Sequence, residues 1–257
     1  MGIYLNSISS YSLYKSEYTR PYFVDKSNLL EELIPLAEQG NTHICITRPR
    51  RFGKTVMANM IGAFFSKGVE SSDVFDRLQI SADKDYRKHL NQHNVIYIDF
   101  SKMPGNCKSY MEYITRIEER LKRDLLKVYS EIEIYPEDSL WDILESIFSE
   151  YIFIFDEWDC IFHKNFITEE DRQNYISFLS NLLKDHAYVS LSYMTGILPI
   201  AKYSSGSELN MFIEYTMASE EKFSEDFGFT ESETDMLYRR YLEICRNEGK
   251  TPYVTRE

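Results

Sequence analysis

Apolar residues along this chain fall into two kinds of segment. Short, nearly continuous apolar runs are typical of strands covered on both faces, and longer stretches with apolar residues three and four positions apart are typical of helices. The chain alternates between the two kinds. This alternation predicts an α/β fold with a central parallel sheet.

Four runs predict strands and a weaker fifth follows them, at residues 43–47, 95–100, 151–155, 189–194 and 212–217. Helical stripes lie between or beside them, at residues 56–65, 111–128, 140–147 and 178–183. Helices that connect parallel strands cover both faces of the sheet. We therefore expect a three-layer sandwich.

The last segment predicts one more helix. Thr230 and Glu233 have the spacing of a capping box, in which each side chain satisfies a backbone N–H group at the start of a helix. Leu237, Tyr241 and Cys245 recur on one face of this helix and would point toward a core. The two expected units are a main domain, residues 1–228, and a small helical appendage, residues 229–257.

Charge and composition exclude several classes of protein. The net charge of −12 argues against a nucleic-acid-binding surface, which needs clustered lysine and arginine. No apolar stretch approaches the roughly 20 residues that cross a bilayer, and the N-terminus lacks the pattern of a secretory signal. We expect a cytoplasmic protein whose four cysteines are free thiols. His89 and His93 lack an adjacent acid in sequence, so we expect them on the solvated surface.

A compact basic cluster lies in one loop between a predicted strand and a predicted helix, and it consists of Arg48, Arg50, Arg51 and Lys54. In the sequence ICITRPRRFGKT, Gly53, Lys54 and Thr55 begin that helix, as a Walker A motif requires. A helix N-terminus offers unpaired N–H groups to phosphate, and Gly53 allows the backbone to approach closely. Lys54 would reach the β- and γ-phosphates of ATP, and the Thr55 hydroxyl would bind Mg²⁺.

One position departs from the general GxxxxGK[ST] pattern. Arg48 stands where the first glycine would be, so the turn after the strand must differ. Arg50 and Arg51 are candidates for lining the phosphates and are equally consistent with solvated charges. The nucleotide-binding residues expected in the loop are Arg50, Arg51, Phe52, Gly53, Lys54, Thr55 and Val56.

A second motif follows the apolar run at residues 151–155, which ends abruptly in Asp156 and Glu157. Ligands of open parallel sheets bind outside the carboxyl ends of the strands, so both acids would face the same site as the loop. As in a Walker B strand, Asp156 would hold Mg²⁺ through water and Glu157 would orient the attacking water. Taken alone, such an acidic pair is often a turn or a helix cap.

Thr195 ends another apolar run, at residues 189–194. If this strand inserts between the strands that precede Lys54 and Asp156, the sheet has the additional-strand order 5-1-4-3-2. Thr195 would then face the γ-phosphate and act as a sensor of hydrolysis. A threonine that caps a turn is nearly as good an interpretation.

These segments resemble a known family. The segments PYFVDKSNLLEEL, TRPRRFGKT, FDEWD and TGILPIAKYSSGSELNMFIEYTM are similar to the predicted AAA-ATPase-like family of bacteria, which is related to the archaeal-type and signal-transducing (STAND) P-loop ATPases. The resemblance runs from Pro21 to about Gly228, and it implies that Arg48 is normal at its position. It also implies that Asp25 and Lys26 help to frame the nucleotide base. A polar helix cap followed by a surface lysine explains these two residues equally well.

Members of the family commonly continue into a lid and a restriction-endonuclease-like domain, and we expect neither of them within these residues. The function we expect is a slow Mg²⁺-dependent ATPase that switches the arrangement of a protein partner, a second copy or a further domain. A nucleotide-gated binding module without significant hydrolysis is the alternative. A scaffold whose phosphate turn has been lost is the third possibility.

Overall fold

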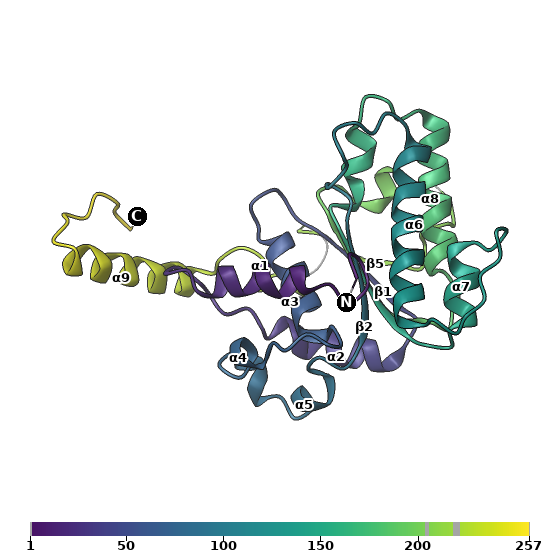
Figure 1. Ribbon diagram of the computed structural model, residues 1–257. Helices are drawn as coiled ribbons and strands as arrows, with labels where there is room; N and C mark the ends of the chain where they lie inside the picture. Colours follow the sequence, from purple (N-terminus) through teal and green to yellow (C-terminus); the bar gives the residue numbers. More distant parts are fainter. Residues whose placement is uncertain (1, 204–205, 218–221, 257) are drawn as a thin grey trace.

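A five-stranded, fully parallel sheet forms the centre of the protein (Figure 1). The computed structural model describes residues 2–203, 206–217 and 222–256. The strand order is β2-β3-β4-β1-β5, which is the predicted additional-strand order. The strands are β1 Thr42–Thr47, β2 Asn94–Asp99, β3 Tyr151–Asp156, β4 Val189–Gly196 and β5 Ile213–Tyr215.

Helices cover both faces of the sheet, as predicted (Figure 1). Side chains of β3 show how the two layers are built, because Ile152 and Ile154 pack into one core while Phe153 and Phe155 pack into the other. One layer contains α1 Ile8–Tyr18, α2 Leu29–Gln39, α3 Lys54–Phe65, α4 Ser72–Phe75 and α5 Tyr86–His89. The other contains α6 Tyr110–Val128, α7 Leu140–Ser146 and α8 Glu169–Leu183.

Three short 3₁₀ helices complete the main body: η1 Gln79–Ala82, η2 Trp158–His163 and η3 Ile200–Lys202. The second of them begins directly after Glu157, so the acidic pair lies between the end of β3 and a tight helical turn. Several helices start with a side-chain cap, and the one at Thr230 is as predicted. Ser139 and Thr230, for example, each accept a hydrogen bond from the third residue of the helix that follows, within a capping box.

The helix α9 Glu231–Asn247 projects from the body as an arm (Figure 1). We predicted that Leu237, Tyr241 and Cys245 would all point into a core, and this is wrong for the first two, which stay half-exposed while Cys245 is buried. The hydroxyl of Tyr241 instead accepts a hydrogen bond from the N–H of Tyr253, in the chain that folds back after the helix. The ring of Tyr241 also packs edge-on against that of Tyr253, so this side chain contacts the chain that follows the helix.

The expectation that His89 and His93 are solvated is also wrong. The two rings stack 5.1 Å apart, and Nε2 of His89 lies 3.0 Å from a carboxylate oxygen of Glu38 on α2. Burial and the neighbouring ring of His89 lower the pKa of His93 to about 4. The acid that the local sequence lacks is therefore supplied from 51 residues earlier in the chain. The contact of His89 with Glu38 links α5 to α2.

The four cysteines carry free thiols, as predicted. In the part of the chain that the structure describes, no helix combines the length and the apolar character needed to cross a membrane. Within the same residues, no group of three or more histidine, cysteine or acidic side chains is arranged to hold a metal ion by itself. A metal at this protein would therefore need ligands of another kind, such as a hydroxyl group or a bound phosphate.

Candidate functional site

The loop between β1 and α3 turns sharply at two residues with positive φ. Gly53 has φ +82° and Arg51 has φ +71°, and Lys54 is the first residue of α3. A side chain at Gly53 would be disfavoured by this left-handed conformation, although the space around it is open. The loop therefore leads into a helix N-terminus whose first N–H groups lack partners within the helix, which is the arrangement that binds anions in proteins.

Lys54 is buried, with 4 % of its side chain exposed. It donates a hydrogen bond of 3.3 Å to the carbonyl oxygen of Pro49. It also lies 3.6 Å from a carboxylate oxygen of Glu157, whose side chain is 26 % exposed. The sequence prediction that these two residues meet at one site, although 103 positions separate them (157 − 54), agrees with this geometry.

Asp156 and Thr55 also come together. Burial, together with the charges of Asp99 and Glu157, raises the pKa of Asp156 to about 6, while the neighbouring hydroxyl of Thr55 and the charge of Lys54 act to lower it. Among the residues that the structure describes, none donates a hydrogen bond to Oδ1 of Asp156, and Tyr97 donates one of 3.4 Å to Oδ2. A buried carboxylate oxygen beside a hydroxyl is a pair of hard ligands suited to Mg²⁺.

Glu157 owes its position to an uncommon backbone conformation. Its φ of +51° and ψ of 44° lie in the left-handed region, which costs a residue with a side chain about 1 to 3 kcal/mol. The turn directs the carboxylate toward Lys54 instead of along the axis of β3. A partly exposed carboxylate at this edge of the sheet can be reached by a water molecule, which a general base requires.

Thr195 lies on the central strand β4, beside Asp156 on one side and Ile46 on the other. Its hydroxyl is fully buried and has no hydrogen-bond partner among the described residues. A side chain at the next residue, Gly196, would collide with Trp158 and Asp159. The strand insertion on which the sensor role of Thr195 depends is therefore present.

Sequence reasoning missed Asp159, which belongs to the same region. Its carboxylate is buried and accepts hydrogen bonds of 3.1 Å from the N–H groups of both Ile197 and Leu198. This contact ties the turn after β3 to the turn after β4. The segment FDEWD contained the residue, but nothing in the local pattern distinguished its partner.

Arg48 does not face the site, contrary to its place in the predicted basic cluster. Its guanidinium is buried and donates hydrogen bonds to the carbonyl oxygens of Thr47 and Tyr215, at 2.9 and 3.0 Å, and to that of Phe223 at 3.5 Å. It also lies over the ring of Phe227. Arg48 therefore anchors the chain that follows β5. Arg50 and Arg51 are exposed on the loop and remain candidates for contacting phosphate.

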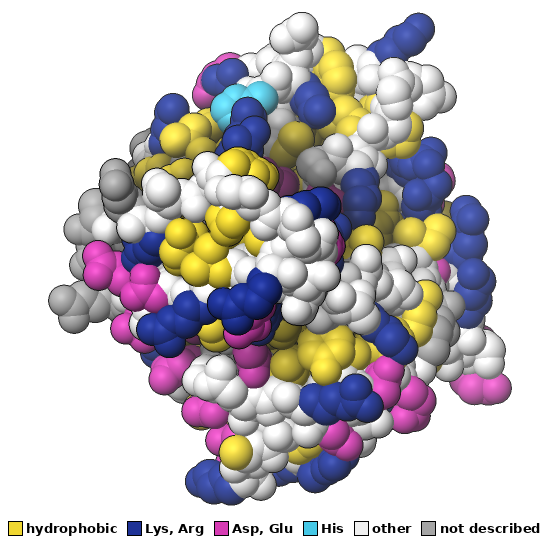
Figure 2. Space-filling model, turned by 90° about the vertical axis from the view of Figure 1, so that its left-hand side faces the viewer, with side chains coloured by type: hydrophobic (Ala, Val, Ile, Leu, Met, Phe, Trp, Pro, Cys, Tyr) yellow, Lys and Arg dark blue, Asp and Glu magenta, His cyan; other side chains and the backbone are white. Residues whose placement is uncertain are grey.

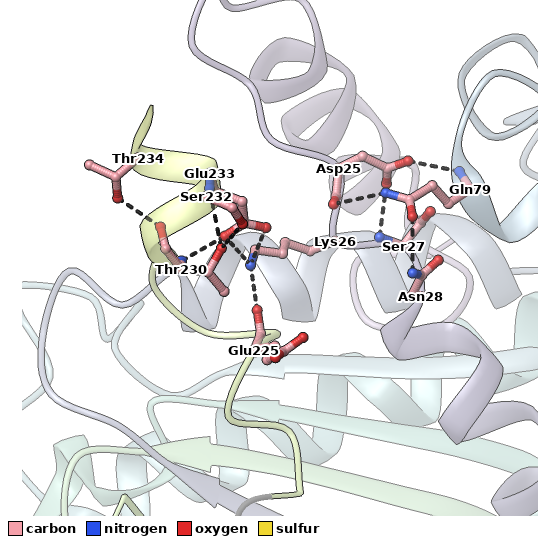
Figure 3. A network of polar contacts seen from close by, with 10 residues as sticks. All are labelled: Asp25, Lys26, Ser27, Asn28, Gln79, Glu225, Thr230, Ser232, Glu233 and Thr234. Carbon is pink, nitrogen blue, oxygen red and sulfur yellow. Dashed lines mark hydrogen bonds and ion pairs between the residues drawn. The ribbon is translucent and has the colours of Figure 1, made fainter. Parts of the chain in front are cut away.

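Asp25 and Lys26 point in different directions (Figure 3). The carboxylate of Asp25 accepts hydrogen bonds from the N–H groups of Ser27 and Gln79, at 2.9 and 2.7 Å. Lys26 is buried and makes an ion pair of 2.6 Å with Glu233 at the start of α9, and it also donates a hydrogen bond to the carbonyl oxygen of Glu225. The alternative of a helix cap followed by a surface lysine fits neither residue. The N-cap of α2 is Asn28 and not Asp25, and Lys26 is buried.

A largely apolar cavity of about 380 Å³ adjoins the loop. Its size is in the range of small-molecule sites in proteins. Three chain segments meet there: residues 20–26, the loop with the first turn of α3, and residues 226–229 after β5. The predicted residues Lys26, Arg51, Phe52, Gly53 and Val56 line it, and Asp25 does not. Sequence reasoning missed the third wall, because no local pattern places Asp226, Gly228 and Phe229 beside the loop.

The side of the molecule from which α9 projects (Figure 1) carries mixed charge (Figure 2). Figure 2 shows lysine and arginine side chains interspersed with acidic and hydrophobic ones, without a continuous basic area on the face in view. The net charge of −12 agrees with this distribution. A compact anion held by a few directed groups fits such a surface better than an extended polyanion does.

Fold and site together define an α/β protein of the P-loop type, with an inserted central strand and charged residues gathered at the carboxyl ends of β1 and β3. The chain belongs to the predicted AAA-ATPase family, whose family model matches residues 7–205. Membership of this family implies nucleotide binding. The matched region contains the loop, both acids and Thr195, and it ends before the third wall of the cavity. No curated protein matches the chain.

Proposed function

We propose that this protein binds ATP with Mg²⁺ and hydrolyses it slowly, using the binding and hydrolysis cycle as a conformational switch. The observation that carries the proposal is the meeting of Lys54, Glu157 and the Thr55–Asp156 pair at one edge of the sheet. Each of these groups was assigned a role in triphosphate chemistry from its local motif. The loop after β1 and the end of β3 bring these groups together although they are far apart in the sequence, and this supports a shared function.

The loop and the start of α3 hold the phosphates in this proposal. The backbone N–H groups after Gly53 bind phosphate oxygens, and Lys54 exchanges its contact with Pro49 for the β- and γ-phosphates. The Thr55 hydroxyl and Asp156 would hold Mg²⁺, which neutralises charge on the phosphates when bound. The raised pKa of Asp156 fits this role, because a buried carboxylate without a full set of donors is stabilised by a cation.

Glu157 is the proton acceptor in this proposal. In the ligand-free arrangement its carboxylate contacts Lys54. Phosphates that attract Lys54 would free the carboxylate to orient and deprotonate a water molecule. Thr195, at the tip of the neighbouring strand, would sense the γ-phosphate and pass its loss to the turn that Asp159 holds.

The cavity beside the loop takes the base and ribose in this proposal. Phe23, Phe52 and Phe229 provide aromatic surface for a flat base, and Lys26 braces the wall behind it through its ion pair with Glu233. Because this ion pair joins the cavity wall to α9, occupation of the cavity would also stabilise the position of the arm. A protein partner or a second copy that contacts α9 could then respond to nucleotide in a cytoplasmic setting.

Calorimetric titration with ATP, ADP and GTP, with and without Mg²⁺, tests the proposal. We expect binding of ATP that Mg²⁺ strengthens. Absence of binding to all three nucleotides would contradict it and favour the scaffold function.

A binding module without significant hydrolysis is the second candidate. It is favoured by the exposed position of Arg50 and Arg51 and by the hydrogen bond that Arg48 donates to the backbone of Tyr215. ATP binding together with no measurable phosphate release would select that candidate.

A further inference from the structure

We infer that Asp226 selects the base of the bound nucleotide, by accepting a hydrogen bond from the 6-amino group of adenine. The inference rests on the proposed function, because it concerns the cavity in which we place the base. It concerns one wall of that cavity, residues 226–229, which lies outside the region that the family model matches. Neither the family nor the loop motif therefore assigns a role to this wall.

The segment that carries Asp226 is held firmly from several sides. Lys26 donates a hydrogen bond to the carbonyl oxygen of Glu225 (Figure 3), and Arg48 reaches the carbonyl oxygen of Phe223. The N–H group of Gly228 donates a hydrogen bond of 3.3 Å to the carbonyl oxygen of Phe52 in the loop. Buried cations and the phosphate loop itself thus fix the backbone on either side of Asp226. Such fixing lowers the entropy lost when a ligand binds.

Asp226 is the acid at the cavity that is available for a ligand. Two acidic side chains line the cavity in the described part of the chain, and the other, Glu17, pairs with Arg20 at 3.1 Å. Among the described residues, none donates a hydrogen bond to Asp226. The apolar part of the cavity lining, such as Phe52 and Met57, gives affinity for a base but does not distinguish one purine from another.

The charged groups around Asp226 are mixed in sign. Burial raises its pKa to about 6; Glu32 and Glu225 act in the same direction, and Lys26 and Arg48 act against it. Near pH 8 the side chain is therefore an ionised acceptor. Adenine presents a hydrogen-bond donor at position 6, where hypoxanthine and guanine present a carbonyl oxygen that a carboxylate repels. An ionised Asp226 beside position 6 thus favours adenine by attraction and disfavours the other two by repulsion.

Binding of nucleoside diphosphates at pH 8 tests the inference, since diphosphates avoid turnover. The four probes are ADP, purine riboside diphosphate, which lacks the 6-amino group, and the diphosphates of inosine and guanosine. We expect the parent protein to bind ADP at least roughly tenfold more tightly than purine riboside diphosphate, as expected for one hydrogen bond to a charged group. In Asp226→Ala this preference should shrink to within about twofold.

Two further variants sharpen the test. Asp226→Asn introduces an amide that can donate to a carbonyl oxygen, so it should bind inosine diphosphate more tightly than the parent does. Glu225→Gln is the matched control. It removes one negative charge from the exposed residue that directly precedes Asp226, and it should leave all preferences unchanged. Thermal unfolding checks that each variant folds.

The possible failures are distinguishable. If Asp226→Ala weakens all four diphosphates equally, Asp226 has only a structural role and the inference is wrong while the proposed function stands. If the parent prefers guanosine diphosphate and Asp226→Ala removes that preference, the carboxylate reads the guanine edge and our assignment of adenine is overturned. If no diphosphate binds at any concentration tested, both the inference and the proposed function fail.

Discussion

The ammonium of Lys54 lies 3.6 Å from a carboxylate oxygen of Glu157, so the loop after β1 and the turn after β3 contact each other through opposite charges. The contact is partly solvated on the glutamate side, with 26 % exposed, and such pairs contribute little stability. Its significance is positional. It places the ammonium of Lys54 beside the carboxylate for which we propose the role of proton acceptor.

Replacing Lys54 by alanine should weaken ATP binding at least roughly tenfold, because a charge-assisted hydrogen bond in a phosphate site contributes about 1.5 to 3 kcal/mol. Isothermal titration measures the change. Lys127→Ala, an exposed position on α6, serves as the control for loss of one positive charge and should bind normally. Unchanged affinity in Lys54→Ala would remove the phosphate site from the loop.

Glu157→Gln should keep ATP binding and lose roughly a hundredfold in turnover, the typical contribution of a general base. The amide preserves the shape of the side chain and abolishes proton acceptance. Glu150→Gln provides a matched control at the opposite end of the same strand, since Glu150 directly precedes β3 and is exposed. Phosphate release under single-turnover conditions is the measurement. Parental rates in Glu157→Gln would assign the base elsewhere.

Asp156 should make the metal-free protein less stable as the pH rises. Its folded pKa of about 6 lies above its ordinary value of 3.8, so between pH 4 and 6 the native state holds more protons than the unfolded state does. Stability due to this group therefore falls across that window and stays low at higher pH. A shift of this size corresponds to roughly 2 to 4 kcal/mol.

Asp156→Asn removes this effect and tests it directly. With a chelator at pH 8, the variant should resist urea better than the parent, while at pH 4 the two should converge. The variant should also lose most of the Mg²⁺ enhancement of ATP binding, because it removes negative charge beside Thr55. If Asp156→Asn were less stable than the parent at pH 8, the carboxylate would be held by favourable contacts that outweigh its burial.

Arg48 should be a stability residue and not a phosphate ligand. Substitution by methionine leaves carbonyl oxygens of Thr47, Tyr215 and Phe223 without a donor, which should lower the free energy of unfolding by roughly 2 to 4 kcal/mol. Arg50→Met is the comparison, since Arg50 is exposed, and its effect should stay within about 0.5 kcal/mol. Urea denaturation without nucleotide separates the two. Equal stability of both variants would mean that the buried guanidinium contributes nothing.

The protein alone should hydrolyse ATP well below the enzyme median of about 10 s⁻¹. Arginines that stabilise transition-state charge raise such rates by roughly 10³ to 10⁵. Of the arginines outside the loop, Arg172 pairs with Glu169 on α8, and Arg240 on α9 donates to backbone carbonyl oxygens near Phe23. Single-turnover rates at rising protein concentration provide the measurement. Fast, concentration-independent turnover would show that Arg50 or Arg51 completes the site in cis.

The sequence by itself determined the elements and the local chemistry. Continuous apolar runs specify buried parallel strands, and caps such as Thr230 specify helix starts, because both depend on residues within a few positions of each other. The same holds for the proposed role of Gly53, Lys54 and Thr55, which rests on a strand, a turn and a helix in direct succession. The order of the strands followed once the inserted strand was recognised.

Only the tertiary structure decided what depends on distant parts of the chain. The guanidinium of Arg48 points inward because carbonyl oxygens about 170 residues later accept its hydrogen bonds. Lys26 pairs with Glu233, which lies 207 residues after it in the chain. The same applies to the cavity wall at Asp226 and to the two hydrogen bonds of Asp159. A buried polar group needs a partner wherever the fold supplies one, and local sequence contains no record of which segment that will be.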